Sequence, residues 1–291
     1  MPKNETKNLL FFLLPYLILF LLLFAFALSY SLILSFTNMS PGRPLEFTGA
    51  TNYVRLFGDP LVWNGFKVVS TVLFIQVPIM TGLALILAIL LSSPLIRGKT
   101  IFRTIFIIPV MTSLVAATLM WYPMFGENYG VINLVLTGIG LPGFKWLLDP
   151  TLALVSIFTV ITWRWTGYNM IMFLAGLQAI PRELYDAAAL DAGRLQTVRH
   201  ITLPLLKPII IFSVVFSIIG SLQLFAEPYV LTSQGTSAGF ATYTVAIRLY
   251  NIGFIQGQFG YASAIGWFMA LVAVCGTFFF LKRLGFFARG E

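Results

Sequence analysis

Six long apolar runs constrain this chain more than any other feature of its sequence. They lie near residues 9–36, 67–92, 104–122, 151–176, 209–232 and 262–281. The hydrocarbon core of a bilayer is about 30 Å thick, so a helix needs about 20 mostly apolar residues to cross it, and each run is about that long or longer. Strands of a membrane barrel would instead alternate apolar and polar residues over about 10 positions. The sequence therefore predicts an all-α, polytopic membrane protein with six transmembrane helices.

Composition agrees with a location in lipid. Charged residues make up only 10% of the 291 positions, well below the roughly 25% of soluble domains. A net charge of +8 could indicate nucleic acid as a partner. However, the basic residues are spread between apolar runs, as expected for cytoplasmic loops. We therefore expect membrane lipid and no nucleic acid.

The distribution of Lys and Arg predicts the orientation, because cytoplasmic loops carry an excess of both residues. With the N-terminus inside, 12 of the 18 basic residues face the cytoplasm: Lys3, Lys7, Arg97, Lys99, Arg103, Arg182, Arg194, Arg199, Lys207, Lys282, Arg283 and Arg289. We therefore expect both termini to be cytoplasmic. The predicted partition is a short cytoplasmic N-terminus at residues 1–8, one membrane domain at 9–281 and a cytoplasmic tail at 282–291.

A polar interruption, residues 181–208, separates the fourth run from the fifth. Acidic and small apolar residues follow Pro181 and predict a short amphipathic helix at residues 182–193, in which Pro181 would occupy the first turn. Ala187 and Ala188 give that helix a surface with little bulk, which another protein can approach closely. The alternative is a helix lying among the lipid headgroups. Its three acids disfavour this, because an anionic leaflet repels carboxylates.

This interruption resembles the cytoplasmic coupling loop of binding-protein-dependent ABC importer permeases. That signature is usually written Glu-Ala-Ala, then Asp-Gly-Ala, then Ile-x-Leu-Pro; this chain has Asp186-Ala187-Ala188, Asp191, and Ile201-Thr202-Leu203-Pro204. Residues 173–181, 227–232 and 259–264 are also similar to the sugar branch of the family, the maltose and glycerol-phosphate type. The usual Gly after Asp191 is missing, so we expect Gly193 to supply a left-handed turn that ends the helix.

The resemblance implies that the loop helix fits a cleft on a cytoplasmic ATPase. The implied coupling residues are Glu183, Asp186, Ala187, Ala188, Asp191, Gly193 and Pro204. The implied partners are a second permease subunit, which is a different chain, two ATPase subunits that bind ATP and Mg²⁺, and an extracytoplasmic substrate-binding protein. The implied location is a prokaryotic plasma membrane, which this chain crosses several times.

This chain itself is predicted to bind no nucleotide and no metal, and to be no enzyme. Gly98-Lys99-Thr100 resembles the end of a phosphate-binding loop, but Ser93 stands where the first Gly is required and no strand precedes it.

Charged residues inside membrane spans are costly, and they are candidates for function. Arg164 lies 17 residues before Pro181 and Glu227 lies 19 residues after Pro208, which places both about 25–29 Å from the inner end of a helix. In a continuous fifth helix, Gly220, Gln223 and Glu227 would share one face. The candidate pathway residues in this layer are Trp163, Arg164, Trp165, Gly167, Tyr168, Asn169, Gln223 and Glu227.

Aromatic faces beside amide and charged groups suit a sugar, and the resemblance favours a di- or oligosaccharide. Several alternatives stay open. Arg164 and Glu227 could form a structural ion pair between helices, and the solute could be glycerol phosphate. Another class is an ion-coupled secondary transporter or channel. A membrane enzyme is disfavoured, because His200 is the only histidine and lies in a loop.

Overall fold

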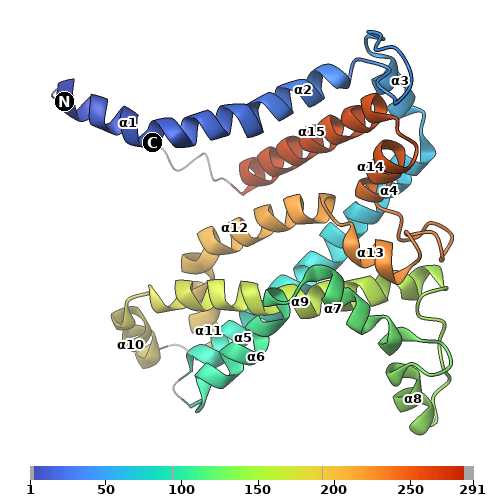
Figure 1. Cartoon of the computed structure of the whole chain (residues 1–291). Coiled ribbons are helices and arrows are strands. Elements are labelled where there is room, and N and C mark those ends of the chain that lie inside the picture. The colour runs from blue at the N-terminus through green and yellow to red at the C-terminus, as the bar shows by residue number, and fades with distance from the viewer. Residues whose placement is uncertain (1–2, 94, 192, 285–291) are drawn as a thin grey trace. The chain divides into compact units, whose positions relative to one another are not determined.

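The computed structural model describes residues 3–93, 95–191 and 193–284 (Figure 1). Every regular element in this part of the chain is a helix, and a single isolated β-bridge joins Thr37 to Phe47. The prediction of an all-α fold is therefore confirmed. Residues 1–2 of the predicted N-terminal segment and residues 285–291 of the predicted tail, including Arg289, lie outside the described residues. The predicted partition of the chain stays a prediction.

The chain forms two compact units, of which the first comprises Met1–Val62 and Arg248–Leu271. Its elements are α1 (Lys3–Leu19), the π-helical η1 (Phe20–Ala25), α2 (Phe26–Leu34), α3 (Thr51–Phe57), the end of α14 (Val245–Tyr250), η5 (Asn251–Ile255) and the first half of α15 (Phe259–Arg283). The indole Nε1 of Trp267 donates a hydrogen bond of 3.2 Å to Ser31 Oγ and ties α15 to α2. At Gly260 a Cβ atom would overlap the Thr37 carbonyl, so this contact requires glycine.

The second unit comprises Trp63–Ile247 and Val272–Glu291. It contains most of α4 (Pro60–Thr71), then η2 (Val72–Gln76), α5 (Val77–Ser92), α6 (Lys99–Met111), α7 (Leu114–Trp121), η3 (Pro123–Phe125), α8 (Val131–Gly138), α9 (Pro150–Gln178), α10 (Arg182–Asp191), α11 (Arg194–Thr197), η4 (Val198–Thr202), α12 (Leu203–Leu222) and α13 (Ala226–Leu231). The long helix α9 packs against α5, α6 and α12 (Figure 1). Its central position makes α9 the scaffold of this unit.

Small residues allow α5 and α9 to pack closely. Ala84 and Ala88 are fully buried one turn apart on α5, and they form a core cluster with Met170 and Phe173 of α9 and Leu206 of α12. Close approach through small side chains is the usual basis of helix association in membranes, because burial from water supplies no driving force there.

Four helical stretches are long and apolar enough to cross a membrane: Phe11–Leu34, Pro60–Ser92, Arg194–Leu222 and Phe259–Arg283. The pair α6–α7 makes a fifth if it is one broken span, since its halves are bent by 100°. Helix α9 has 29 residues, which is long enough, but polar residues in its middle lower its mean hydropathy. Six crossings therefore stay a prediction.

Two of the expected continuous helices are wrong. The expected helix at 104–122 breaks at Thr112–Ser113, where the backbone is extended. The expected helix at 209–232 ends at Leu222 and resumes as α13 at Ala226. Hydropathy detects apolar character, but it does not detect where the backbone turns.

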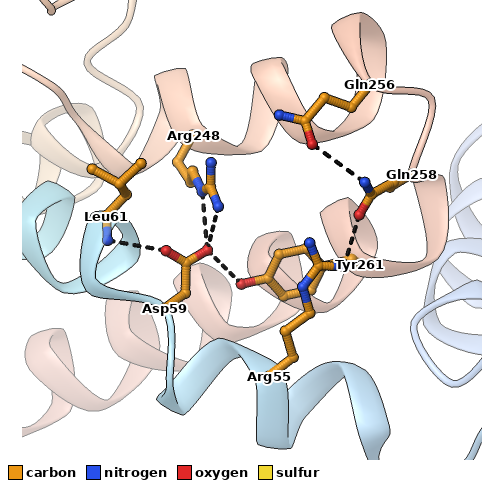
Figure 2. Close-up of polar contacts among 7 residues, drawn as sticks. All are labelled: Arg55, Asp59, Leu61, Arg248, Gln256, Gln258 and Tyr261. Atoms are coloured by element: carbon orange, nitrogen blue, oxygen red, sulfur yellow. Dashed lines mark hydrogen bonds and ion pairs between the residues drawn. The ribbon is translucent and has the colours of Figure 1, made fainter.

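A buried polar cluster organises the first unit (Figure 2). Asp59 Oδ2 accepts hydrogen bonds from Arg248 Nη2 at 2.6 Å, Arg248 Nε at 3.0 Å and the Tyr261 hydroxyl at 2.8 Å. Asp59 Oδ1 accepts from the Leu61 N–H at the start of α4. The Arg55 guanidinium lies 4.0 Å above the Tyr261 ring. The cluster therefore joins two regions that are far apart in the sequence, residues 55–61 and 248–261.

We expect Asp59→Ala to be strongly destabilising. Removing the carboxylate leaves the Arg248 guanidinium, 15% exposed, without its counter-ion, and breaking a buried pair typically costs about 3–5 kcal/mol. The measurement is the thermal unfolding temperature of the purified protein in detergent. Glu127→Ala is the control, because the Lys145–Glu127 pair is 66% and 42% exposed and such pairs contribute about 0–1 kcal/mol. Equal shifts for the two variants would contradict the assignment.

The Asp59 network also predicts a pH dependence. Burial alone would raise the pKa of Asp59, but hydrogen bonds from Arg248 and Tyr261 and the charge of Arg248 hold that pKa below its ordinary value of 3.8. A depressed carboxyl pKa contributes stability that is present above the ordinary value and is lost as the pH falls through the folded-state value. The difference in unfolding temperature between wild type and Asp59→Asn should therefore stay constant from about pH 7 to about pH 5, then narrow below about pH 4.

Candidate functional site

A cavity of about 420 Å³ lies within the second unit. Helix α9, the end of α12 and the beginning of α13 form much of its wall, together with η2 and α5. The expected pathway residues that line it are Trp165, Tyr168, Asn169, Gln223 and Glu227. Five of the eight candidates chosen from the sequence therefore meet at one cavity, although their role in transport stays a prediction.

The break between α12 and α13 brings two of these side chains to the cavity. Gln223 follows the last residue of α12, and its φ and ψ of −88° and 4° end the helix. Glu227 lies in the first turn of α13. The expected stripe on a continuous helix is therefore wrong as a local structure, yet Gly220, Gln223 and Glu227 all line the cavity.

Glu227 is only 4% exposed. Among the residues that the structure describes, no Lys or Arg lies within ion-pair distance of it; the charge of Arg164 acts on the carboxylate from farther away, so the alternative of a direct Arg164–Glu227 ion pair is not observed. A buried carboxylate needs compensating hydrogen-bond donors. The cavity is the space from which a ligand's hydroxyl groups could supply them.

Asn169 connects two walls of the cavity. Its side-chain Oδ1 accepts a hydrogen bond of 2.5 Å from Ser213 on α12, and its Nδ2 donates to the Trp165 carbonyl at 2.9 Å. Asn169 is 5% exposed. It therefore fixes α12 against α9 and also presents a polar surface to the cavity.

Serines on α12 are functional candidates that sequence reasoning missed. Ser213, Ser217 and Ser221 all line the cavity. Ser217 donates to the Ser213 carbonyl and Ser221 to the Ser217 carbonyl, so each hydroxyl oxygen keeps acceptor capacity. Their spacing of four residues, which places them on one face of a helix, was the signal available in the sequence.

Arg164 does not line the cavity, although it is next to Trp165. Its Nη1 donates to the Pro109 carbonyl at 3.3 Å, and its Nη2 donates to the carbonyls of Val110 at 3.4 Å and Thr112 at 2.9 Å. These carbonyls lie at the C-terminal end of α6. Arg164 therefore contacts the backbone at the α6–α7 break.

The two remaining pathway candidates also point elsewhere. At Gly167 a Cβ atom would overlap the Phe106 carbonyl, so this glycine allows α6 to approach α9. Trp163 packs edge-on against Trp121 with ring centroids 5.6 Å apart. It lines a second, larger hollow of about 870 Å³ between α4–α5 and α9. These positions indicate packing roles.

The predicted loop helix is present as α10, Arg182–Asp191. Pro181 precedes it, so the expected place of Pro181 within the first turn is wrong by one residue. Glu183, Asp186 and Ala187 are exposed, and Ala188 is half-buried. Tyr185 faces the other way, where its hydroxyl lies 3.3 Å from Thr202 Oγ1. The side chain of Asp191 and the whole of Ala192 lie outside the described residues.

The end of the loop differs from the expectation. Gly193 has a φ of −72° and an extended backbone, so it makes no left-handed turn. Its N–H donates to Gln196 Oε1 and begins α11. Helix then runs from Arg194 to Leu222, with π-helical geometry at η4 just before Pro204 and with Pro208 in its interior. Proline has no backbone N–H, so it cannot make the usual hydrogen bond of an α-helix. The π-helical turn at η4 is where the helix adjusts to this missing bond.

Comparisons with known proteins agree with this architecture. Residues 80–282 match the model of the family of binding-protein-dependent transport system inner membrane components. Over 257 residues the chain is 41% identical to the lactose transport system permease protein LacF of Rhizobium radiobacter, covering 85% of this chain and 84% of that protein. It is 34% identical over 264 residues to the arabinooligosaccharides transport system permease protein AraP of Bacillus subtilis (strain 168), with coverages of 89% and 82%.

A solved structure has the same fold. It is a chain of a bacterial ABC transporter involved in the import of the acidic polysaccharide alginate, with a TM-score of 0.82 and 96% of each chain covered. Its identity to this chain is 24%, so it supports the fold alone. On the family match and these two curated relatives, this chain belongs to the binding-protein-dependent transport system inner membrane components, the permease subunits of ABC importers.

Proposed function

We propose that this chain forms the translocation pathway for a di- or oligosaccharide in an ATP-driven importer. The observation that carries this proposal is a mostly apolar cavity into which polar side chains of α9, α12 and α13 converge; these three helices lie within the residues that match the family. The curated relatives named for lactose and arabinooligosaccharides support a sugar as the solute.

The chemistry of the cavity fits a sugar. The rings of Trp165 and Tyr168 offer faces on which the apolar side of a pyranose can pack. Gln223 and Glu227 can accept hydrogen bonds from hydroxyl groups, and bonds to a carboxylate are the stronger kind. An anion such as glycerol phosphate fits less well, because it would lie near the Glu227 carboxylate in a medium of low dielectric constant.

We further propose that the chain crosses a prokaryotic plasma membrane six times. In this arrangement α6–α7 is one broken span, α9 is the fourth span, and both termini are cytoplasmic. The excess of basic residues in the predicted inner segments supports this orientation. The long connections at 37–66, 123–150 and 233–261 would then face the extracytoplasmic binding protein.

The proposed partner of α10 is a cytoplasmic ATPase subunit. Its exposed surface combines Glu183 and Asp186 with the small side chain of Ala187, so a protein groove could contact the backbone closely. Two ATPase subunits would bind ATP and Mg²⁺, and a second, different permease subunit would complete the pathway. Nucleotide-driven closure of the ATPases would then move α9 and α12, which flank the coupling loop at residues 181–208.

The pathway proposal predicts that Gln223→Ala and Glu227→Gln impair transport. Gln223→Ala removes an amide from the cavity, and Glu227→Gln replaces the charged acceptor by a neutral one; a neutral hydrogen bond contributes about 0.5–1.5 kcal/mol and one to a charged group about 1.5–3 kcal/mol, so we expect a loss of about threefold to tenfold or more in the rate of transport. The measurement is lactose uptake by the complete complex in proteoliposomes, as KM and Vmax. Thr100→Ala is the control, because Thr100 is exposed and lies neither at the cavity nor in the long connections. Unchanged KM and Vmax in both cavity variants, with normal assembly, would contradict the proposal.

The coupling proposal predicts that Ala187→Arg lowers substrate-stimulated ATP hydrolysis by about tenfold or more, because the larger side chain would overpack a fitted protein groove. Hydrolysis by the purified complex is the measurement. Ala187→Ser is the matched control, since it changes the same exposed position and adds almost no bulk. Normal stimulation in the Ala187→Arg variant would refute a docking role for this face.

A further inference from the structure

We propose that Arg164 is a positioning residue, which fixes the break between α6 and α7 and through it one wall of the cavity. This inference rests on the proposed function only in treating the cavity as part of the transport pathway. It differs from the role expected from the sequence, in which Arg164 contacts the solute.

Backbone carbonyls at the break between α6 and α7 require hydrogen-bond donors, and Arg164 supplies them. Helix α6 ends at Met111, α7 begins at Leu114, and the two are bent by 100°. The last carbonyls of a helix have no partners within that helix, and unpaired backbone groups are costly in lipid. Arg164 reaches three carbonyls in this region, those of Pro109, Val110 and Thr112.

The need is mutual. Arg164 is 7% exposed, and among the described residues no acid forms an ion pair with it. A buried guanidinium requires compensation, and the C-terminal end of a helix provides it, because the carbonyls form the negative end of the helix dipole. Both Nη atoms of Arg164 donate hydrogen bonds to carbonyls at the end of α6.

A second contact keeps the helices within reach of each other. Gly167 follows Arg164 by three residues on α9, and its lack of a side chain lets the Phe106 carbonyl approach closely. Any larger residue would push α6 away from α9 at this level. The carbonyls at the break would then move away from the guanidinium.

The break is connected to the cavity. Leu114, the first residue of α7, lines the cavity, as does Trp165 beside Arg164. Helix α7 also packs against α13 (Figure 1), and Ala226 and Glu227 at the start of α13 line the cavity. A change in the direction of α7 would therefore move two parts of the wall.

The first experiment does not depend on the solute. Cys275→Ser provides a background without cysteine, in which Leu114→Cys reports access to the cavity wall through its rate of reaction with a water-soluble maleimide. We expect Arg164→Met to change this rate by about threefold or more in the complete complex, and Arg164→Lys to change it less, because Lys keeps the charge but not the two-armed donor geometry. Thr112→Val is the matched control. It removes a hydroxyl that also donates to the Pro109 carbonyl and leaves the guanidinium in place.

The second experiment separates positioning from solute contact. In lactose uptake by the complete complex, Arg164→Met should lower Vmax by about tenfold or more and leave KM within about twofold. Gly167→Ala should act in the same direction, because it displaces α6 by a different route. Arg164→Lys should restore part of Vmax.

Each outcome decides the question. A raised KM with normal Vmax would overturn the proposal in favour of solute contact, and unchanged labelling together with unchanged Vmax would overturn it entirely. If the Met variant does not assemble, the Lys variant decides: a smaller change of the same kind supports the proposal, and wild-type labelling and uptake reject it. A wild-type complex that does not take up lactose or another oligosaccharide would refute the proposed function, while the labelling rates would still decide the role of Arg164.

Discussion

The structure of the second unit depends on satisfying backbone groups where its helices break. In lipid, water is not available to pair with free carbonyl and amide groups, so irregular backbone is tolerated only where protein or a cavity surrounds it. At the α6–α7 break the partner is Arg164. Near the α12–α13 break it is Thr244, which is fully buried and donates to the Leu224 carbonyl at 2.6 Å. Both breaks lie beside the same cavity, as in transporters with discontinuous helices.

Close helix packing around α9 makes these contacts possible. Ala84 and Ala88 allow α5 to approach α9 on one side, and Gly167 allows α6 to approach it on another. Close packing through these small residues restricts how far the helices can shift or tilt relative to one another. The polar groups of α9 are therefore presented at fixed positions, with Trp165, Tyr168 and Asn169 toward the cavity and Arg164 toward the break.

Buried charges in this chain fall into three kinds, and the distinction indicates function. Asp59 and Arg248 neutralise each other within a hydrogen-bonded cluster (Figure 2). Arg164 is compensated by backbone carbonyls. Glu227 forms no ion pair among the described residues; a backbone N–H and the more distant charge of Arg164 act on its carboxylate, and it lies against a cavity. Of these buried charges, Glu227 is the one that lines the cavity, so the pathway proposal uses it and not Asp59 or Arg164.

The sequence by itself determined the helical class, the positions of the apolar segments and a helix beginning at residue 182, because hydropathy and the spacing of polar residues are local properties; the shared depth of Arg164 and Glu227 stays a prediction, since the helix on which it was counted breaks after Leu222. Five of the eight pathway candidates chosen from the sequence line one cavity in the structure. Only the tertiary structure decided that Arg164 faces α6 and that α12 ends at Leu222, since these depend on backbone groups of other segments. Gly193 is another case that the sequence did not decide. The sequence predicted a left-handed turn there, but Gly193 is extended because it precedes the first residue of α11.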